Sequence, residues 1–184
     1  MPDETAESKS PKHTKKQTAL FIIGLTAMLA GVGILGFFAV RKAVRWFRKQ
    51  QLMRENYVVE IPAIGLQAPV LEGTEQAILR QAAGHFPGCG SFGSGNYCIA
   101  AHSSPLYKEY FNPLKNAETG MEIRLYNVEK DFVTYIISEM QYVAPSDTWV
   151  LDDFGDDRIT LITCNDDGSE RLVVTGMLRN DSPA

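Results

Sequence analysis

Apolar residues follow two different patterns along this chain. One unbroken run, Ala19 to Val40, holds 22 residues without a charge. As a helix this run would be about 33 Å long, which is enough to cross the hydrocarbon core of a bilayer. From Asn56 onward, short β-branched and aromatic runs alternate with Gly, Pro, Asn and Asp, which is typical of strands joined by turns. The pattern therefore predicts a membrane-spanning helix followed by a β-rich domain.

The flanks of the apolar run indicate how it is used. Residues 1–18 are polar and are expected to be a disordered tail, residues 19–40 the transmembrane helix, and residues 41–55 a basic juxtamembrane linker. A secretory signal peptide is the alternative. The run is long for the apolar part of a signal peptide, and basic residues follow it instead of a cleavage site, so we favour an uncleaved anchor. Basic residues lie on both sides, so charge alone leaves the orientation open.

Residues 56–184 are expected to form one domain of short strands. Thr74 resembles a helix N-cap, and the apolar residues between Ala77 and Ala83 predict one helix that ends at Gly84–Gly88. Seven or eight strands at short spacing with one or two short helices favour a mainly β fold, a small mixed-to-antiparallel barrel. The predicted strands are 57–61, 65–71 (interrupted by Pro69), 97–101, 121–128, 131–143, 158–164 and 171–178.

Charge is divided unevenly between the two parts. Residues 1–54 carry ten of the 18 Lys and Arg residues but three of the 22 Asp and Glu residues. The remainder is strongly acidic, and this argues against nucleic-acid binding, which needs clustered basic residues. Because the basic residues flank the apolar run, we expect membrane lipid to be their partner.

The three cysteines do not form a metal motif. Cys89, Cys98 and Cys164 have no CxxC or Cys/His spacing, so a zinc site is not expected. Cys89 and Cys98 can pair, or all three can be reduced, and the sequence leaves both open. The acidic segment 152–157 lacks the alternating spacing of a calcium loop and is expected to be a solvated loop. We therefore expect no cofactor. Activation by calcium stays an alternative that no matched site supports.

The segment Ile159–Arg171 carries the strongest chemical signal. A β-branched run ends at Cys164, a polar turn follows, and Arg171 opens the next apolar run. Two strands joined by this turn would place the thiol near the guanidinium, and its length would set their separation. A thiol beside a cation is a candidate nucleophile, and Arg171 is a candidate ligand for an oxyanion. The plain alternative is a hairpin with an inert cysteine and a surface arginine.

His102 completes the candidate set. It follows the apolar run 97–101, as Cys164 follows its own run, and the ends of barrel strands meet at a rim. Imidazole titrates in the range needed to protonate a leaving amine. Thr163, next to Cys164, is a weaker candidate that would act by hydrogen bonding. His85 is expected to cap or pack at the end of the predicted helix, and Cys98 to lie in the core.

Several of these segments together resemble the sortases, the membrane-anchored cysteine transpeptidases of Gram-positive bacteria. The run Thr160–Cys164 is similar to the family's TLxTC signature, and Arg171–Gly176 to its arginine strand. The run Asn96–His102 resembles the strand before its histidine, with Ala101 where the family usually has glycine. Two further similar segments are Ile61–Leu66 and Gly84–Gly88.

The resemblance implies a closed eight-stranded sortase barrel behind an N-terminal anchor. It implies Cys164 as nucleophile, His102 as general acid and base, and Arg171 as the oxyanion and substrate ligand, with Thr163 and Ala101 as substrate-binding residues. The implied reaction cleaves an LPxTG-like sorting signal between Thr and Gly through a thioester. An amino group, such as that of a peptidoglycan precursor, then accepts the protein. The N-terminus would be cytoplasmic and the barrel extracellular.

Other activities remain open on the sequence alone. The chain shows no long N-terminal lid and no second apolar span, which favours a single-anchor class A-, D- or E-like sortase over a pilin-linking one. An anchored cysteine peptidase would use water as the acceptor. A non-catalytic anchored binding domain would need neither Cys164 nor His102.

Overall fold

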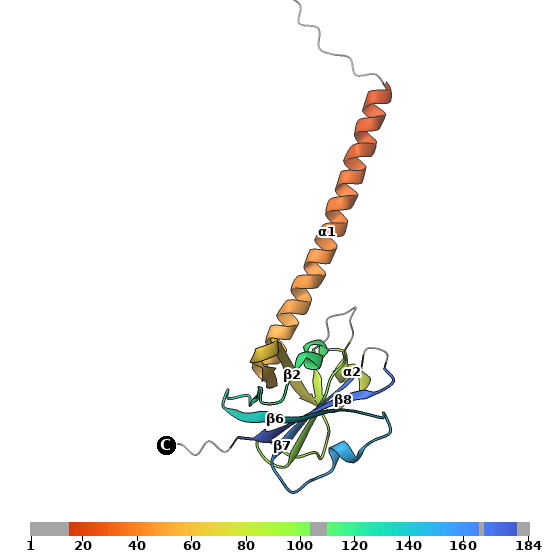
Figure 1. Ribbon diagram of the computed structural model, residues 1–184. Coiled ribbons are helices and arrows are strands. Elements are labelled where there is room, and N and C mark those ends of the chain that lie inside the picture. The colour runs from red at the N-terminus through yellow and green to blue at the C-terminus, as the bar shows by residue number, and fades with distance from the viewer. Residues whose placement is uncertain (1–14, 104–109, 166–167, 180–184) are drawn as a thin grey trace, which may run out of the picture. The chain divides into compact units, whose positions relative to one another are not determined.

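The computed structural model describes residues 15–103, 110–165 and 168–179. The chain divides into two compact units, Met1–Phe47 and Arg48–Ala184. Helix α1, Lys15–Glu55, contains the apolar run and extends through the predicted basic linker (Figure 1). By length and composition it can cross a membrane. Its large apolar side chains are exposed, Leu35 by 71%, as a lipid-facing helix requires.

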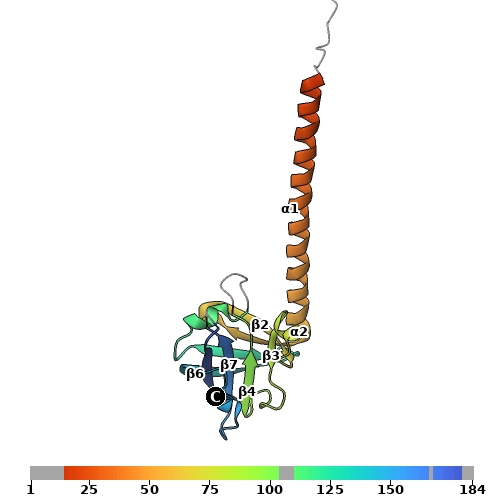
Figure 2. The same cartoon turned by 90° about the vertical axis from the view of Figure 1, so that its right-hand side faces the viewer.

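The second unit is a closed barrel of eight strands, in the order β1-β2-β3-β4-β7-β8-β6-β5 (Figures 1 and 2). The predicted mainly β barrel is therefore confirmed. The strands are β1 (Tyr57–Ile61), β2 (Leu66–Glu72), β3 (Ala83–His85), β4 (Asn96–Ala100), β5 (Glu122–Tyr126), β6 (Phe132–Val143), β7 (Arg158–Cys164) and β8 (Arg171–Leu178). The short helices are α2 (Gln76–Leu79) and the 3-10 helices η1 (Pro62–Ile64), η2 (Asn112–Asn116) and η3 (Trp149–Leu151).

Two strand pairs, β2–β3 and β4–β7, are parallel, and the others are antiparallel. The sheet is thus mixed, as predicted. Pro69 lies within β2, where β1 is its neighbour on one side and β3 begins to pair only at Val70. The missing N–H of proline is tolerated there, because β2 is locally an edge strand at that residue.

The prediction of a helix through Ala83 was wrong. Helix α2 has four residues, and Ala83–His85 is strand β3. Gly84 pairs with Leu71 on one side and with Ala100 on the other. A Cβ on Gly84 would collide with the carbonyl oxygen of Gly73. This tertiary packing overrides the local helical pattern.

Alternate residues of the strands face two separate apolar clusters. The core inside the barrel includes Ile99, Leu161 and Val174. A second, outer cluster is formed by Val143, Val150, Ile162 and Val173, with Phe86, Ala100 and Leu151 packed against it. Helix η3 contributes Val150 and Leu151, so it covers the outer face of β4, β7 and β8.

The last turn of α1 belongs to the barrel unit. The Lys130 Nζ donates to the carbonyl oxygens of Met53 at 2.9 Å and Arg54 at 3.4 Å. Carbonyls at a helix C-terminus have no partner within the helix, so a lysine from the β5–β6 turn satisfies them. One turn earlier, Lys49 Nζ lies 5.1 Å from the ring centroid of Tyr110. The residues from Arg48 onward are thus part of the folded unit.

These contacts predict that a barrel fragment beginning at Arg48 has a higher Tm than one beginning at Asn56. Lys130→Ala should destabilise the longer fragment by about 1 kcal/mol, because it leaves helix-end carbonyls without a donor. The same substitution should have no effect in the shorter fragment, which lacks those carbonyls. Thermal unfolding followed by circular dichroism measures all four values. An equal loss in both fragments would contradict the capping role of Lys130.

Candidate active site

Cys164 and Arg171 lie opposite each other at the end of the β7–β8 hairpin. Cys164 is the last residue of β7 and Arg171 the first residue of β8, and they are direct partners in the antiparallel register. Side chains of directly opposed residues lie on the same face of a sheet. Both residues are half-buried. The strand register, more than the length of the turn, therefore sets how close the thiol and the guanidinium are.

His102 extends the neighbouring strand to the same edge. In the parallel β4–β7 pair, Ala100 is opposite Ile162. The pairing continues beyond the ladder, since the Ala101 N–H donates to the Ile162 carbonyl at 3.2 Å. Two residues further along each chain, His102 is level with Cys164. Figure 2 shows β4 and β7 side by side.

The three predicted catalytic residues share the outer face of the barrel. Ala100, Ile162 and Val173 belong to the outer cluster. Side chains alternate between faces along a strand, so His102 and Cys164, two residues past the first two, are on this face. Arg171, two residues before Val173, is on it too. Within the described residues, no hydrogen bond or ion pair joins these three side chains directly.

The turn between β7 and β8 holds Arg171. The Arg171 Nη1 donates to the carbonyl oxygens of Gly168 and Glu170, each at 3.2 Å. Asn165 closes the turn, because its N–H donates to the Glu170 carbonyl at 3.1 Å and its side-chain oxygen accepts from the Glu170 N–H at 3.2 Å. The predicted turn residues Asp166 and Asp167 lie outside the described residues. The guanidinium is thus fixed at one end by backbone carbonyls of its own turn.

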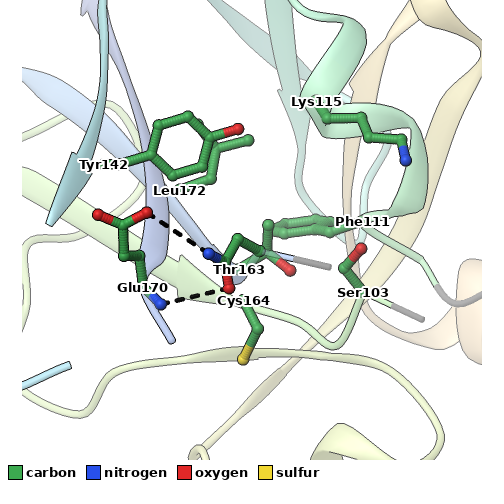
Figure 3. Close-up of a pocket in the computed structure, with 9 residues that line it drawn as sticks. Ser103, Phe111, Lys115, Tyr142, Thr163, Cys164, Glu170 and Leu172 are labelled. Atoms are coloured by element: carbon green, nitrogen blue, oxygen red, sulfur yellow. Dashed lines mark hydrogen bonds between the residues drawn. The ribbon is translucent and has the colours of Figure 1, made fainter. Parts of the chain in front are cut away.

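A cavity of about 330 Å³ opens beside Cys164 (Figure 3). Cys164 is the one predicted catalytic residue that lines it, and its thiol points away from Tyr142 and Leu172 in this view. Thr163 and Leu172 also line the cavity. Each is one residue away from the Cys164–Arg171 pair along its strand, so both side chains point to the opposite face of the sheet. The thiol therefore lies at a boundary, with the cavity on one side and the face that carries His102 and Arg171 on the other. The other described residues that line it are Ser103, Phe111, Lys115, Tyr142, Asn165 and Glu170.

The two predicted substrate-binding residues connect β4 and β7. The Thr163 hydroxyl donates to the Ala101 carbonyl at 2.8 Å, and both residues are buried. This bond lies one residue before Cys164 on β7 and one residue before His102 on β4. Thr163 lines the cavity. The bond fastens together the two strand ends that carry the thiol and the imidazole.

The sequence leads us to expect that the loops 104–116 and 143–157 set substrate choice, and Phe111 and Lys115 of the first loop line the cavity. Individual cavity residues were not identified from the sequence. Ser103 and Glu170 adjoin His102 and Arg171 in sequence, so adjacency was a usable signal for them. Phe111 and Lys115 come from the η2 region and Tyr142 from β6. No local pattern links these segments to Cys164, and the closed barrel brings them together.

His85 has a structural environment, in agreement with its expected packing role. Its ring is buried and stacks on Tyr97 with centroids 4.1 Å apart. Its Nε2 donates to the Cys89 carbonyl at 2.7 Å, and its Nδ1 lies 2.8 Å from Glu72 Oε2. These contacts tie the loop after β3 to the barrel wall.

Most carboxylates of the segment 152–157 have protein partners. Asp153 accepts from the Gly155 N–H at 2.9 Å, and Asp157 accepts from the Gly95 N–H at 2.8 Å. Asp156 pairs with Arg158, which lowers the pKa of that carboxyl. The described part of the chain contains no group of three or more His, Cys, Asp or Glu residues arranged to hold a metal ion. The acidic segment thus uses its charges to shape the loop before β7.

The chain is similar to several known proteins. A family model described as the sortase domain matches residues 59–179. Sortase A of Bacillus anthracis is 33% identical over 122 residues, which cover 65% of this chain and 58% of that protein. The chain therefore spans a little over half the length of this relative.

Two solved structures share the fold. The Sortase D5 transpeptidase of Clostridium perfringens has a TM-score of 0.62 and 29% identity, covering 68% of this chain and 79% of that one. The pilus-related Sortase C of Group B Streptococcus has the same TM-score and 28% identity, covering 70% of this chain and 69% of that one. With its eight-stranded barrel and its match to the family model over residues 59–179, the chain belongs to the sortase family.

Proposed function

We propose that this sortase is a membrane-anchored cysteine transpeptidase that cleaves an LPxTG-like sorting signal between Thr and Gly. The observation that carries the proposal is the convergence of three strand ends, which place Cys164 opposite Arg171 and level with His102 on one face. A thiol nucleophile, a titratable imidazole and a fixed cation are the groups that acyl transfer needs.

The reaction follows from these roles. The Cys164 thiolate attacks the Thr carbonyl carbon, and the Arg171 guanidinium stabilises the oxyanion of the tetrahedral intermediate. His102 gives a proton to the leaving Gly amine as the C–N bond breaks, which leaves a thioester on Cys164. An acceptor amine, such as that of a peptidoglycan precursor, then attacks the thioester and loses its proton to His102. The products are a new amide, the free Cys164 thiolate and a His102 that is protonated again.

The cavity supports this assignment, because Cys164 lines it and a peptide bound there lies beside the strand end that carries the thiol. Its lining includes the aromatic side chains of Phe111 and Tyr142, together with Lys115 and Glu170. We propose that the residues on the amino-terminal side of the scissile bond occupy this cavity. Thr163 and Ala101 contribute to substrate binding mainly by holding β4 and β7 together beside this cavity.

The catalytic roles predict a graded loss of activity in the full-length chain in detergent micelles. With an LPxTG peptide and triglycine, Cys164→Ala should abolish the thioester and the amide product. His102→Ala should lower the turnover roughly 10²- to 10⁴-fold, and Arg171→Ala roughly 10²- to 10³-fold. Cys89→Ala is the matched control and should retain wild-type activity, because Cys89 lies outside the catalytic set. Mass spectrometry of the acyl-enzyme and of the products measures each step.

The same assay separates the alternatives. Hydrolysed peptide without any amide adduct would indicate a peptidase that uses water. An adduct formed with a pilin-type lysine peptide but not with triglycine would indicate a pilin-linking sortase. Full turnover in the Cys164→Ala variant would eliminate the proposal.

Thr163→Val tests the positioning of the two strand ends. Valine keeps the shape of threonine but cannot donate to the Ala101 carbonyl, so the free energy of unfolding should fall by about 1 kcal/mol. Thr160→Val is a matched control, because the Thr160 hydroxyl also connects β7 to β4, through Asn96 Oδ1 at 2.7 Å. We expect similar destabilisation in both variants but a roughly tenfold loss of kcat in Thr163→Val alone. Equal losses of kcat would show that Thr163 acts through stability only.

We also propose a single-pass topology, with residues 1–18 cytoplasmic, 19–40 in the bilayer, 41–55 as the juxtamembrane linker and 56–184 as the extracellular catalytic barrel. The apolar helix and the family support a membrane anchor. In intact protoplasts, externally added proteinase should remove a C-terminal tag and leave an N-terminal tag intact. Protection of the C-terminal tag would reverse the orientation.

A further inference from the structure

Cys89 and Cys98 form a pair of neighbouring thiols that the proposed reaction does not use. Cys98 lies on β4 and is fully buried, whereas Cys89, in the loop after β3, is half-buried, and both are free thiols. The Phe86 N–H donates to the Cys98 carbonyl at 3.0 Å, and the Cys89 N–H donates back to the Phe86 carbonyl at 3.1 Å. This tight turn folds Cys89 back over Cys98. The two thiols approach the carbonyls of consecutive residues, Leu151 and Val150, which places them close to each other.

The loop that carries Cys89 is held in this position. His85 donates from Nε2 to the Cys89 carbonyl at 2.7 Å, and the His85 ring is itself fixed by stacking on Tyr97. His85 pairs with Ile99, the residue after Cys98 on β4. The hydrogen bond from His85 therefore holds the backbone of Cys89 close to Cys98. The pairing of β3 with β4 and the hydrogen-bonded turn at Phe86–Cys89 thus keep the two thiols close together.

Both thiols also contact η3. The Cys89 thiol donates to the Leu151 carbonyl at 3.6 Å, and the Cys98 thiol lies 4.0 Å from the Val150 carbonyl. Asn96 Nδ2 donates to the same Val150 carbonyl at 3.0 Å. Asn96 and the two thiols together fasten η3 onto β4.

From this arrangement we propose that Cys89 and Cys98 are a redox modification site, which a disulfide oxidant converts to an intramolecular disulfide that loosens η3. The proposal does not depend on the transpeptidase reaction, since neither thiol takes part in it.

The chemistry is a two-step thiol–disulfide exchange with a small-molecule disulfide such as oxidised glutathione. Cys89 reacts first, because it is partly exposed, while burial and the adjacent Cys89 thiol raise the pKa of Cys98. Its thiolate attacks one sulfur of the oxidant and releases the first glutathione thiol. The Cys98 sulfur then attacks the Cys89 sulfur of the mixed disulfide and releases the second. Two protein thiols are oxidised, one glutathione disulfide is reduced, and the two protons end on the released thiols.

Distance excludes a disulfide between Cys98 and Cys164. Thr160 is the register partner of Cys98, and Cys164 lies four residues beyond it on β7. Four strand residues span about 13 Å, whereas a disulfide requires Cα atoms within about 7 Å. The disulfide of the proposed pair therefore does not include Cys164.

Oxidation has a local structural consequence. A disulfide has no S–H, so the Leu151 carbonyl loses the hydrogen bond from Cys89 and the Val150 carbonyl loses its contact with the Cys98 thiol. Asn96 remains as the bond to Val150. Val150 packs with Ile162 and Val173, the residues two positions from Cys164 and Arg171. The pair therefore acts on the cover of the face that carries the proposed catalytic residues.

Peptide mapping of the full-length chain in detergent tests the modification. After incubation with oxidised glutathione, unreacted thiols are alkylated and the protein is digested with trypsin, which leaves both cysteines on residues 81–108. We expect this peptide to lose two alkylatable thiols without gaining glutathione. Chymotryptic cleavage at Phe92 or Tyr97 should leave the two halves joined until a reductant is added.

Variants identify the order of the steps. Cys98→Ala should accumulate the mixed glutathione disulfide on Cys89, whereas Cys89→Ala should leave Cys98 unmodified. Cys164→Ala is the control and should form the Cys89–Cys98 disulfide as the wild type does. A stable glutathione adduct on wild-type Cys89, or no reaction at either thiol, would overturn the proposal.

Hydrogen exchange tests the effect on η3. The Leu151 and Asp152 amides donate to Thr148 and Trp149 carbonyls, each at 3.0 Å. Oxidation should speed exchange of these amides in the wild type and leave it unchanged in Cys89→Ala. Unchanged exchange in oxidised wild-type protein would show that the disulfide does not loosen η3.

Discussion

The pairing of β7 with strands of opposite direction is the constraint on which the site depends. Because β4 runs parallel to β7, both strands end at the same edge, and because β8 runs antiparallel, it begins there. His102, Cys164 and Arg171 therefore meet although 62 residues separate the first two in sequence. If β4 ran antiparallel to β7, His102 would lie at the opposite end, about 20 Å away at 3.3 Å per residue.

Side chains along β7 alternate between the barrel core, which they stabilise, and the outer face, where Cys164 lies. Ile159 and Leu161 are fully buried in the core, and burial of each such side chain contributes about 1.5–3 kcal/mol. On the other face, Thr160 bonds to Asn96, Ile162 packs in the outer cluster, and Cys164 is left at the strand end. The buried residues hold the strand in register, so Cys164 needs little side-chain packing of its own to stay in place.

Sequence reasoning succeeded where a local pattern decides the structure. The bounds of β7 and β8 matched the prediction because apolar, β-branched runs end there at a polar turn. It failed for α2 and β3, where Gly84 joins a sheet through contacts with Leu71 and Ala100 that no window of local sequence contains. The cavity was missed for the same reason, since Phe111 and Tyr142 reach Cys164 only through barrel closure. The catalytic roles of Cys164, His102 and Arg171 stay predictions.

The position of each cysteine on the outer face governs what its thiol can do. Cys98, in the middle of β4, is covered by η3 and the Cys89 loop, and burial raises the pKa of its thiol, so it is a poor first nucleophile and a suitable resolving partner. Cys164, at the end of β7, borders a cavity and lies opposite a cation. Cys164 lies four residues beyond Thr160, the partner of Cys98 in the β4–β7 pair. The Cys98 and Cys164 thiols are therefore too far apart to reach each other. A single sheet face can therefore carry Cys98 of the proposed redox pair and Cys164, the proposed nucleophile, without a disulfide between them.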